Sequence, residues 1–257
     1  MAMPINFTQL FRDSWNFMRN QRGFVMKFML ILLIASAGMS LLASTLQSSV
    51  TNPEQMDQTQ LAQAMLEQSQ QPSRQLFFLF NQGITLFISS WALAVIHSIN
   101  QQRGINLVTS AAFTARRFVG VALLSILSVF PLFIGLWFAF GNMSNNQSPS
   151  ILSLMLMIAG IILFIRLCLV SVEYLLQPVS MQSAVKNILI LGAKRTGTLF
   201  FYCLIVNFFL PLIGIQLSAM AVNTVFSVIV LAAIALVSLF SLIFTYRFYS
   251  IFSNQAM

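Results

Sequence analysis

Long apolar runs alternate with short polar segments along the whole chain. A helix needs about 20 consecutive apolar residues to cross a bilayer. Six segments meet this requirement, and they lie at about 24–46, 76–98, 118–140, 151–172, 197–217 and 222–245. The last two form one run, which we divide where polar residues cluster between Gln216 and Asn223. The pattern therefore predicts an all-α integral membrane protein with six transmembrane helices arranged as three hairpins.

The composition indicates that lipid is the solvent of this chain. Of its 257 residues, 58% are hydrophobic and 7% are charged, whereas a soluble domain carries roughly 25% charged residues. The net charge of +8 would otherwise suggest nucleic acid as a partner. Because the basic residues are thinly spread and flank the apolar runs, we reject nucleic acid and expect the lipid bilayer to be the partner.

The positions of Lys and Arg predict the orientation of the spans. All of the 13 basic residues except Arg74 and Arg166 lie before or at the start of the first span, or in the segments after the second, fourth and sixth spans. Cytoplasmic loops of membrane proteins carry the excess of Lys and Arg. Both termini are therefore expected in the cytoplasm.

Polarity divides the chain into two parts. Residues 1–23 form a cytoplasmic amphipathic segment, and residues 24–257 form the six-helix transmembrane domain. Within that domain, the outer loop at 47–75 is rich in Gln and holds three of the 5 acidic residues. This loop is either a partner-binding segment or a tolerated insertion, and we favour the insertion.

Three cytoplasmic segments share an amphipathic pattern at helical spacing, and each leads into a pair of spans. Their apolar positions are Phe7, Leu10, Phe11, Trp15 and Met18; Ile105, Val108, Ala111, Ala112 and Ala115; and Met181, Ala184, Val185, Ile188 and Leu189. An apolar stripe beside basic residues is typical of a helix that lies in the headgroup plane, where anionic lipid headgroups are its expected partners. We therefore expect an interfacial helix before each hairpin. Internal repeats occur in transporters, and duplication also builds stable bundles without transport, so both interpretations stay open.

The segment FRDSWNFMRNQ (11–21), followed by a long apolar span, resembles the start of the YciC family of bacterial inner-membrane proteins. The chain length, the six spans and the repeated amphipathic segments are similar to that family as well. The resemblance covers the whole chain in organisation and mainly the N-terminal segment in motif. It implies a multi-pass protein of the bacterial inner (plasma) membrane and supplies no catalytic, cofactor-binding or metal-binding residues.

The sequence offers little for catalysis. An intramembrane protease would need a Ser–His pair, paired aspartates or an HExxH segment, and no acidic residue lies well inside a predicted span. His97, the single histidine, is interpreted as an interfacial residue near the cytoplasmic end of the second span. Cys168 and Cys203 lack the spacing of a metal site or a disulfide. We expect no enzyme activity, no cofactor and no metal.

Polar residues in or beside the spans are candidates for a solute pathway or for helix packing. Arg166 stands inside the run IILFIRLCLVSVEYLL (161–176), and Glu173 follows seven residues later, nearly on the same face of a continuous helix. Asn207 and Asn223 belong to the fifth and sixth spans. Arg166 is either a functional group or a side chain that bends toward the cytoplasmic headgroups. We favour the second interpretation because its span ends near residue 172.

These observations favour a non-enzymatic inner-membrane protein that acts through lipid or protein contacts in the cell envelope. The alternative is a small-solute transporter or channel. A continuous polar lining that joins Arg166, Asn207 and Asn223 would distinguish the alternative from the favoured function.

Overall fold

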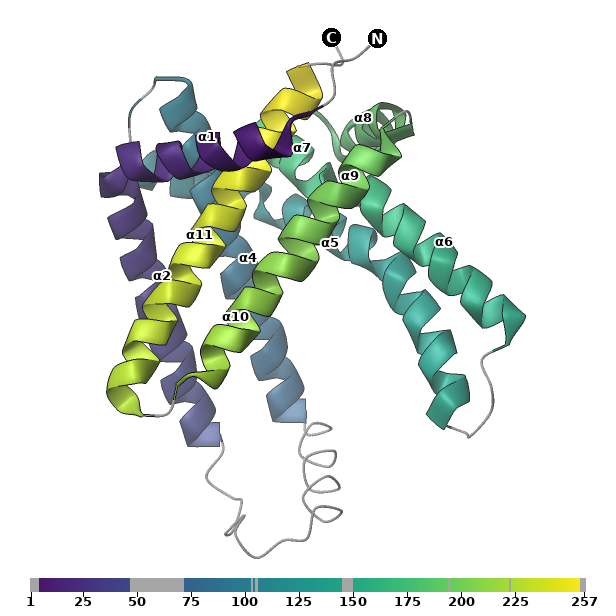
Figure 1. Ribbon diagram of the computed structural model, residues 1–257, viewed down its shortest axis with the longest axis horizontal. Coiled ribbons are helices and arrows are strands. Elements are labelled where there is room, and N and C mark those ends of the chain that lie inside the picture. The colour runs from purple at the N-terminus through teal and green to yellow at the C-terminus, as the bar shows by residue number, and fades with distance from the viewer. Residues whose placement is uncertain are drawn as a thin grey trace, which may run out of the picture.

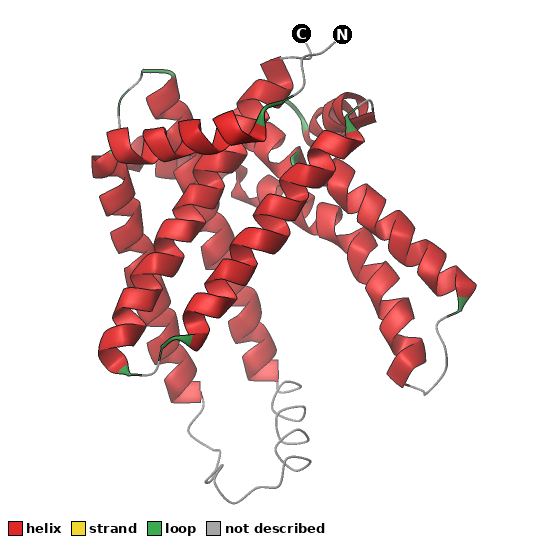
Figure 2. Ribbon diagram, viewed as in Figure 1, coloured by secondary structure: helices red, strands yellow, loops and turns green. Residues whose placement is uncertain are grey.

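The computed structural model describes residues 5–46, 72–102, 104, 106–144, 150–193, 195–221 and 223–254. These residues form helices joined by short connections, and Figure 2 contains no strand among them. The elements in chain order are α1 (Phe7–Asn20), α2 (Arg22–Leu46), α4 (Pro72–Asn100), α5 (Leu107–Ser144), α6 (Ile151–Leu167), α7 (Val170–Leu176), α8 (Met181–Ala193), α9 (Thr196–Cys203), the π-helix η2 (Leu204–Phe209), α10 (Leu210–Ala219) and α11 (Thr224–Asn254).

Six helical stretches of the described chain are long and apolar enough to cross a membrane. They lie at Arg22–Ala43, Pro72–Asn100, Leu107–Phe138, Ile151–Leu176, Thr196–Ala219 and Phe226–Ser253. The predictions of an all-helical fold and of six helices long and apolar enough to span a membrane are confirmed for the described residues. Their arrangement as three hairpins stays a prediction. Of the expected outer loop at 47–75, residues 47–71 lie outside the described residues. Its last four residues form the start of α4.

The second expected interfacial helix is not a separate element. Residues 107–117 form the first turns of α5, which continues to Ser144. Asn106 starts this helix by accepting a hydrogen bond of 3.1 Å from the backbone N–H of Thr109. No Gly or Pro stands between Thr109 and Phe118. Because nothing there ends the helix, the amphipathic stretch joins the third span directly.

The first amphipathic segment forms α1, which Asn6 caps at its N-terminus. The helix packs on α11 through a buried face made of Leu10, Ser14 and Phe17. Trp15, which we expected in the same stripe as Leu10, is 60% exposed. The face toward the protein is therefore rotated from the predicted stripe, and it leaves a large aromatic side chain on the outer surface.

The third amphipathic segment forms α8. Its buried positions are Ala184, Ile188 and Gly192, which recur at the spacing of one helix face. The helix packs against α6 and α7. The position of α1 and α8 relative to a bilayer stays a prediction.

The last helix, α11, packs against α1, α2, α4, α7 and α10. Figure 1 shows α11 (yellow) crossed by α1 near the end of the molecule where both termini lie. One stretch of α11 carries Phe244, Phe248 and Phe252, which are fully buried. Phe248 stacks on Tyr202 of α9, with 4.4 Å between the ring centroids, and on Phe7 of α1 at 6.1 Å. These aromatic contacts attach α1 and α9 to the last helix.

The helices α5 and α6 pack with their backbones in near contact. A Cβ atom at Gly135 would lie 2.6 Å from Cα of Met157, and a Cβ atom at Gly160 would meet the carbonyl of Pro131. Small residues permit such an approach between membrane helices. In Figure 1 this pair diverges from the other helices toward the end away from the termini. Its outer side chains, such as Phe133, are exposed.

The fifth span contains a π-helical segment. Pro211 has no N–H group and cannot donate to the carbonyl of Asn207, four residues earlier. Over the preceding residues of η2 the helix widens, and the N–H of Leu210 donates to the carbonyl of Ile205. The chain therefore accommodates the proline by changing its hydrogen-bond spacing just upstream.

Candidate functional site

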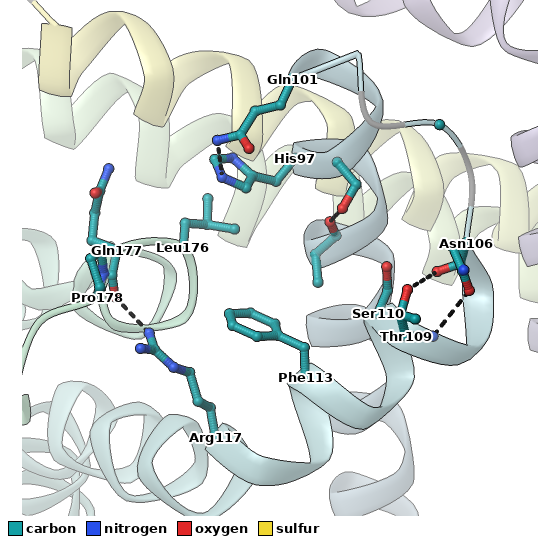
Figure 3. A pocket seen from close by; sticks show the side chains of 13 residues that line it. His97, Gln101, Asn106, Thr109, Ser110, Phe113, Arg117, Leu176, Gln177 and Pro178 are labelled. Carbon is teal, nitrogen blue, oxygen red and sulfur yellow. Dashed lines mark hydrogen bonds between the residues drawn. The ribbon is translucent and has the colours of Figure 1, made fainter.

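A polar hollow of about 540 Å³ lies between the C-terminal end of α4, the first turns of α5 and the α7–α8 connection. Figure 3 shows His97, Gln101, Phe113, Arg117 and Gln177 around it. These side chains come from three segments that are far apart in the sequence. A hollow on which charged and amide groups converge is the usual form of a binding site, and we take it as the candidate site.

Arg117 is held in place at one wall of the hollow. Its Nη1 donates hydrogen bonds to the backbone carbonyls of Tyr174 (2.7 Å) and Gln177 (2.6 Å). Its guanidinium carbon lies 5.2 Å from the ring centroid of Phe113 and 5.5 Å from that of Tyr174. Carbonyls at the C-terminal end of a helix lack partners within that helix. Arg117 therefore caps α7 and fastens the α7–α8 connection to α5.

His97 links the hollow to α11. Its Nδ1 lies 3.2 Å from the hydroxyl oxygen of Tyr246, and its Nε2 lies 2.7 Å from Nε2 of Gln101. The hydroxyl of Tyr246 and the amide group of Gln101 therefore lie within hydrogen-bond distance of the two ring nitrogens. The imidazole is half-buried between α4 and α11. The interpretation of His97 as only an interfacial residue is incomplete, because it borders the candidate site.

Glu173 is buried on α7, with 4% of its surface exposed. Tyr249 of α11 donates a hydrogen bond of 2.6 Å to one carboxyl oxygen. Asn187 of α8 donates a hydrogen bond of 3.2 Å to the other. The carboxyl group therefore connects α7 to α8 and α11. Glu173 directly precedes Tyr174, whose carbonyl accepts a hydrogen bond from Arg117.

Arg166 and Glu173 form no ion pair in the described structure. The expected common face needs a continuous helix, but α6 ends at Leu167 and a two-residue turn precedes α7. This turn changes the rotation of the chain, and Glu173 faces α8 and α11 instead. The side chain of Arg166 is half-buried, and its Nε has no hydrogen-bond partner.

The two asparagines named from the sequence lie apart from this site. The side chain of Asn207 is exposed on η2 and makes no hydrogen bond within the described residues. Asn223 precedes α11, and its side chain accepts a hydrogen bond of 3.0 Å from the N–H of Phe226. Asn223 is therefore a helix cap. The structure does not bring Arg166, Asn207 and Asn223 together.

A smaller hollow of about 150 Å³ lies between α2, α4 and α11, and its polar lining includes Ser36, Asn81, Thr85 and Ser238. The hydroxyl of Thr85 donates to the carbonyl of Asn81 within the same helix (2.9 Å). Across the described ranges, no group of three or more His, Cys, Asp and Glu side chains is placed to hold a metal ion.

Sequence reasoning counted Arg117 only as one of the cytoplasmic charges. One signal was available, because Pro178 marks the end of α7 and the last carbonyls of a helix need donors. The donor, however, stands 57 residues before Tyr174. Nothing in the local pattern distinguishes Arg117 from its neighbour Arg116, which is exposed.

A protein of Haemophilus influenzae, described as an uncharacterized protein, is 38% identical to this chain over 257 residues. The alignment covers 98% of this chain and 100% of the relative. The chain belongs to the family of this Haemophilus protein. No protein-family model and no solved structure matches the chain, so the resemblance to the YciC family stays a prediction.

Proposed function

We propose that the protein is a non-enzymatic, multi-pass protein of a bacterial inner membrane that acts by binding lipids or proteins at its cytoplasmic end. Both termini lie in the cytoplasm, and α1 and α8 lie in the plane of the headgroups. The hollow around Arg117 and His97 is the contact site. The bacterial origin of the relative supports the inner-membrane location.

The pairing of polar side chains inside the helix bundle is the observation that carries this proposal. Glu173 accepts hydrogen bonds from Tyr249 and Asn187. The hydroxyl of Tyr202 donates to Thr245 (3.0 Å). A solute pathway needs polar groups that a solute can reach, whereas these groups are occupied by one another.

The separation of the expected pathway residues supports the same conclusion. Arg166 is near the end of α6, Asn207 is on the exposed side of η2, and Asn223 caps the start of α11. A transporter or channel that used these three groups would need them along one lining. Their positions favour binding over transport.

The orientation rests on the asymmetry of the basic residues. In Figure 1 both termini, α1, the α4–α5 connection and α8 lie at one end of the molecule. Segments at this end carry the described basic residues Arg12, Arg19, Arg22, Arg116 and Arg195. Arg74 lies in the first turn of α4, at the other end of the molecule. The positive-inside rule assigns the first end to the cytoplasm.

The test is labelling of single cysteines in a variant that carries Cys168→Ala and Cys203→Ala. A membrane-impermeant thiol reagent is added to intact cells that produce Arg166→Cys, Ser73→Cys or Thr8→Cys. Ser73 and Thr8 are exposed near opposite ends of the molecule. We expect Ser73→Cys to react, and Thr8→Cys to react only after the cells are permeabilised.

Protection of Arg166→Cys in intact cells is the expected result for a closed bundle. Reaction of Arg166→Cys from the outer face would contradict the proposal and favour a small-solute transporter or channel. Reaction of Thr8→Cys in intact cells would reverse the orientation.

A further inference from the structure

We propose that the hollow between α4, α5 and the α7–α8 connection binds a phosphate group, with Arg117 as its principal ligand. This inference rests on the proposed function, because it names the chemical class that the contact site recognises. The phosphate is carried either by an anionic phospholipid headgroup or by a small soluble phosphate ester.

The charge of the lining selects an anion. None of the described residues that border the hollow is Asp or Glu. The carbonyls of Tyr174 and Gln177, which would otherwise attract a cation, already accept hydrogen bonds from Nη1 of Arg117. The guanidinium therefore offsets the attraction of these carbonyls for a cation, and Arg117 gives this wall a positive charge.

The geometry of Arg117 leaves one edge of its guanidinium for a ligand. Both hydrogen bonds to protein come from Nη1, so the N–H groups of Nε and Nη2 are unused within the described residues. These two groups form the side-on edge that binds two oxygens of one phosphate. The rings of Phe113 and Tyr174 flank the guanidinium and restrict its motion, and Arg117 lines the hollow.

The other lining residues suit the rest of a phosphate ester. Gln101 and Thr109 are polar, and they border the hollow from α4 and α5. Phe113, Leu176 and Pro178 provide apolar surface for the carbon atoms of the ester. A volume of about 540 Å³ is within the usual range for small-ligand sites, roughly 300–1,000 Å³.

The experiment measures binding of dihexanoyl-phosphatidylglycerol and of glycerol 3-phosphate to the purified full-length protein in a maltoside detergent. Dihexanoylglycerol, which has the same chains and no phosphate, is the control ligand. Two variants address the hollow: Arg117→Gln removes the cation, and Thr109→Trp fills the space from an exposed position.

Each variant has a matched control from the neighbouring residue. Arg116→Gln removes an exposed arginine that does not border the hollow, and Val108→Trp places the same ring at a position that is 79% exposed. Size-exclusion profiles establish that each variant is folded. If Arg117→Gln fails that check because α7 loses its cap, Thr109→Trp decides the outcome.

We expect Arg117→Gln to weaken phosphate binding about tenfold or more, because a charge-assisted contact is lost. Thr109→Trp should weaken it to a similar extent, because the indole ring occupies the space of the ligand. Arg116→Gln and Val108→Trp should bind as the native protein does. Binding of the phospholipid alone identifies a lipid headgroup, and equal binding of glycerol 3-phosphate identifies a soluble ester.

Equal binding of either phosphate ligand by Thr109→Trp and Val108→Trp would overturn the inference, and so would equal binding of phosphatidylglycerol and dihexanoylglycerol by the native protein. Reaction of Arg166→Cys from outside would instead overturn the proposed function and leave phosphate binding unchanged. The two failures are therefore distinguishable.

Discussion

Tyr249 donates a hydrogen bond of 2.6 Å to the carboxyl group of Glu173, which lies 76 residues earlier in the chain. This contact connects α11 to α7, and Asn187 adds α8 through the second carboxyl oxygen. A buried carboxyl group that loses a donor keeps its desolvation penalty without compensation. The pair is therefore the most direct point at which to test the packing of α7, α8 and α11.

We predict that Tyr249→Phe lowers the free energy of unfolding by about 1–3 kcal/mol. Unfolding by sodium dodecyl sulfate in mixed micelles measures this change. In a protein that already carries Glu173→Leu, Tyr249→Phe no longer leaves a carboxyl group without its donor. A double-mutant cycle of the two substitutions should therefore give a coupling energy of similar size. Additive effects of the two substitutions would contradict the contact.

The close approach of α5 and α6 leads to a prediction for their glycines. Gly135→Ala and Gly160→Ala should each destabilise the protein by about 1–3 kcal/mol, since the added Cβ meets backbone atoms that cannot move away. Gly214→Ala in α10 is the control, because a Cβ there meets nothing within 4 Å. In detergent, the midpoint temperature of thermal unfolding of the control should equal or exceed that of the native protein. A native-like midpoint for Gly160→Ala would mean that the helices are farther apart.

The two asparagines should respond to substitution in opposite ways. Asn223→Ala removes the cap of α11 and should cost about 1 kcal/mol of stability. Asn207→Leu removes an exposed polar group without a partner in the described protein, and it should leave stability unchanged or raise it. Unfolding in mixed micelles compares them directly. Strong destabilisation by Asn207→Leu would indicate a partner for Asn207 that lies outside the described contacts.

Two aromatic residues of α1 and α11 should differ in how much they contribute to the stability of the protein. Phe248 is fully buried, and Phe248→Ala should cost about 3–5 kcal/mol. Trp15 is 60% exposed on α1, and Trp15→Ala should change stability in detergent by less than about 0.5 kcal/mol. Similar losses from the two substitutions, measured by thermal unfolding, would mean that α1 packs through a different face.

The sequence predicted the spans well because hydrophobic length is a local property. Each run of about 20 apolar residues had to become a helix in lipid, whatever its neighbours were. The same local reasoning failed at residues 105–117, because an amphipathic pattern does not say where a helix ends. It failed again between Arg166 and Glu173, where a two-residue turn changes which face of the chain meets which neighbour.

The candidate site was not predictable in the same way. Tyr246 lies 149 residues from His97, and the carbonyls that hold Arg117 lie 57 and 60 residues away. No spacing rule connects residues so far apart, and a lone histidine at the end of a span gives no sign of its partner. Only the packing of α4 and α7 on α11, and of α5 on α4 and α7, brings these groups to one place.

The dependence of so many contacts on α11 also sets an order of events during synthesis. Tyr246 and Tyr249, the partners of His97 and Glu173, stand in the last twelve residues of the chain. At about 5–20 residues per second, the ribosome reaches Tyr249 roughly 4–15 seconds after Glu173. During that time Glu173 has no tyrosine donor, and α1 gains its contacts with Phe244 and Phe248 only near the end of it. The packing of α1, α4 and α7 on α11 therefore cannot be completed until α11 has been synthesised.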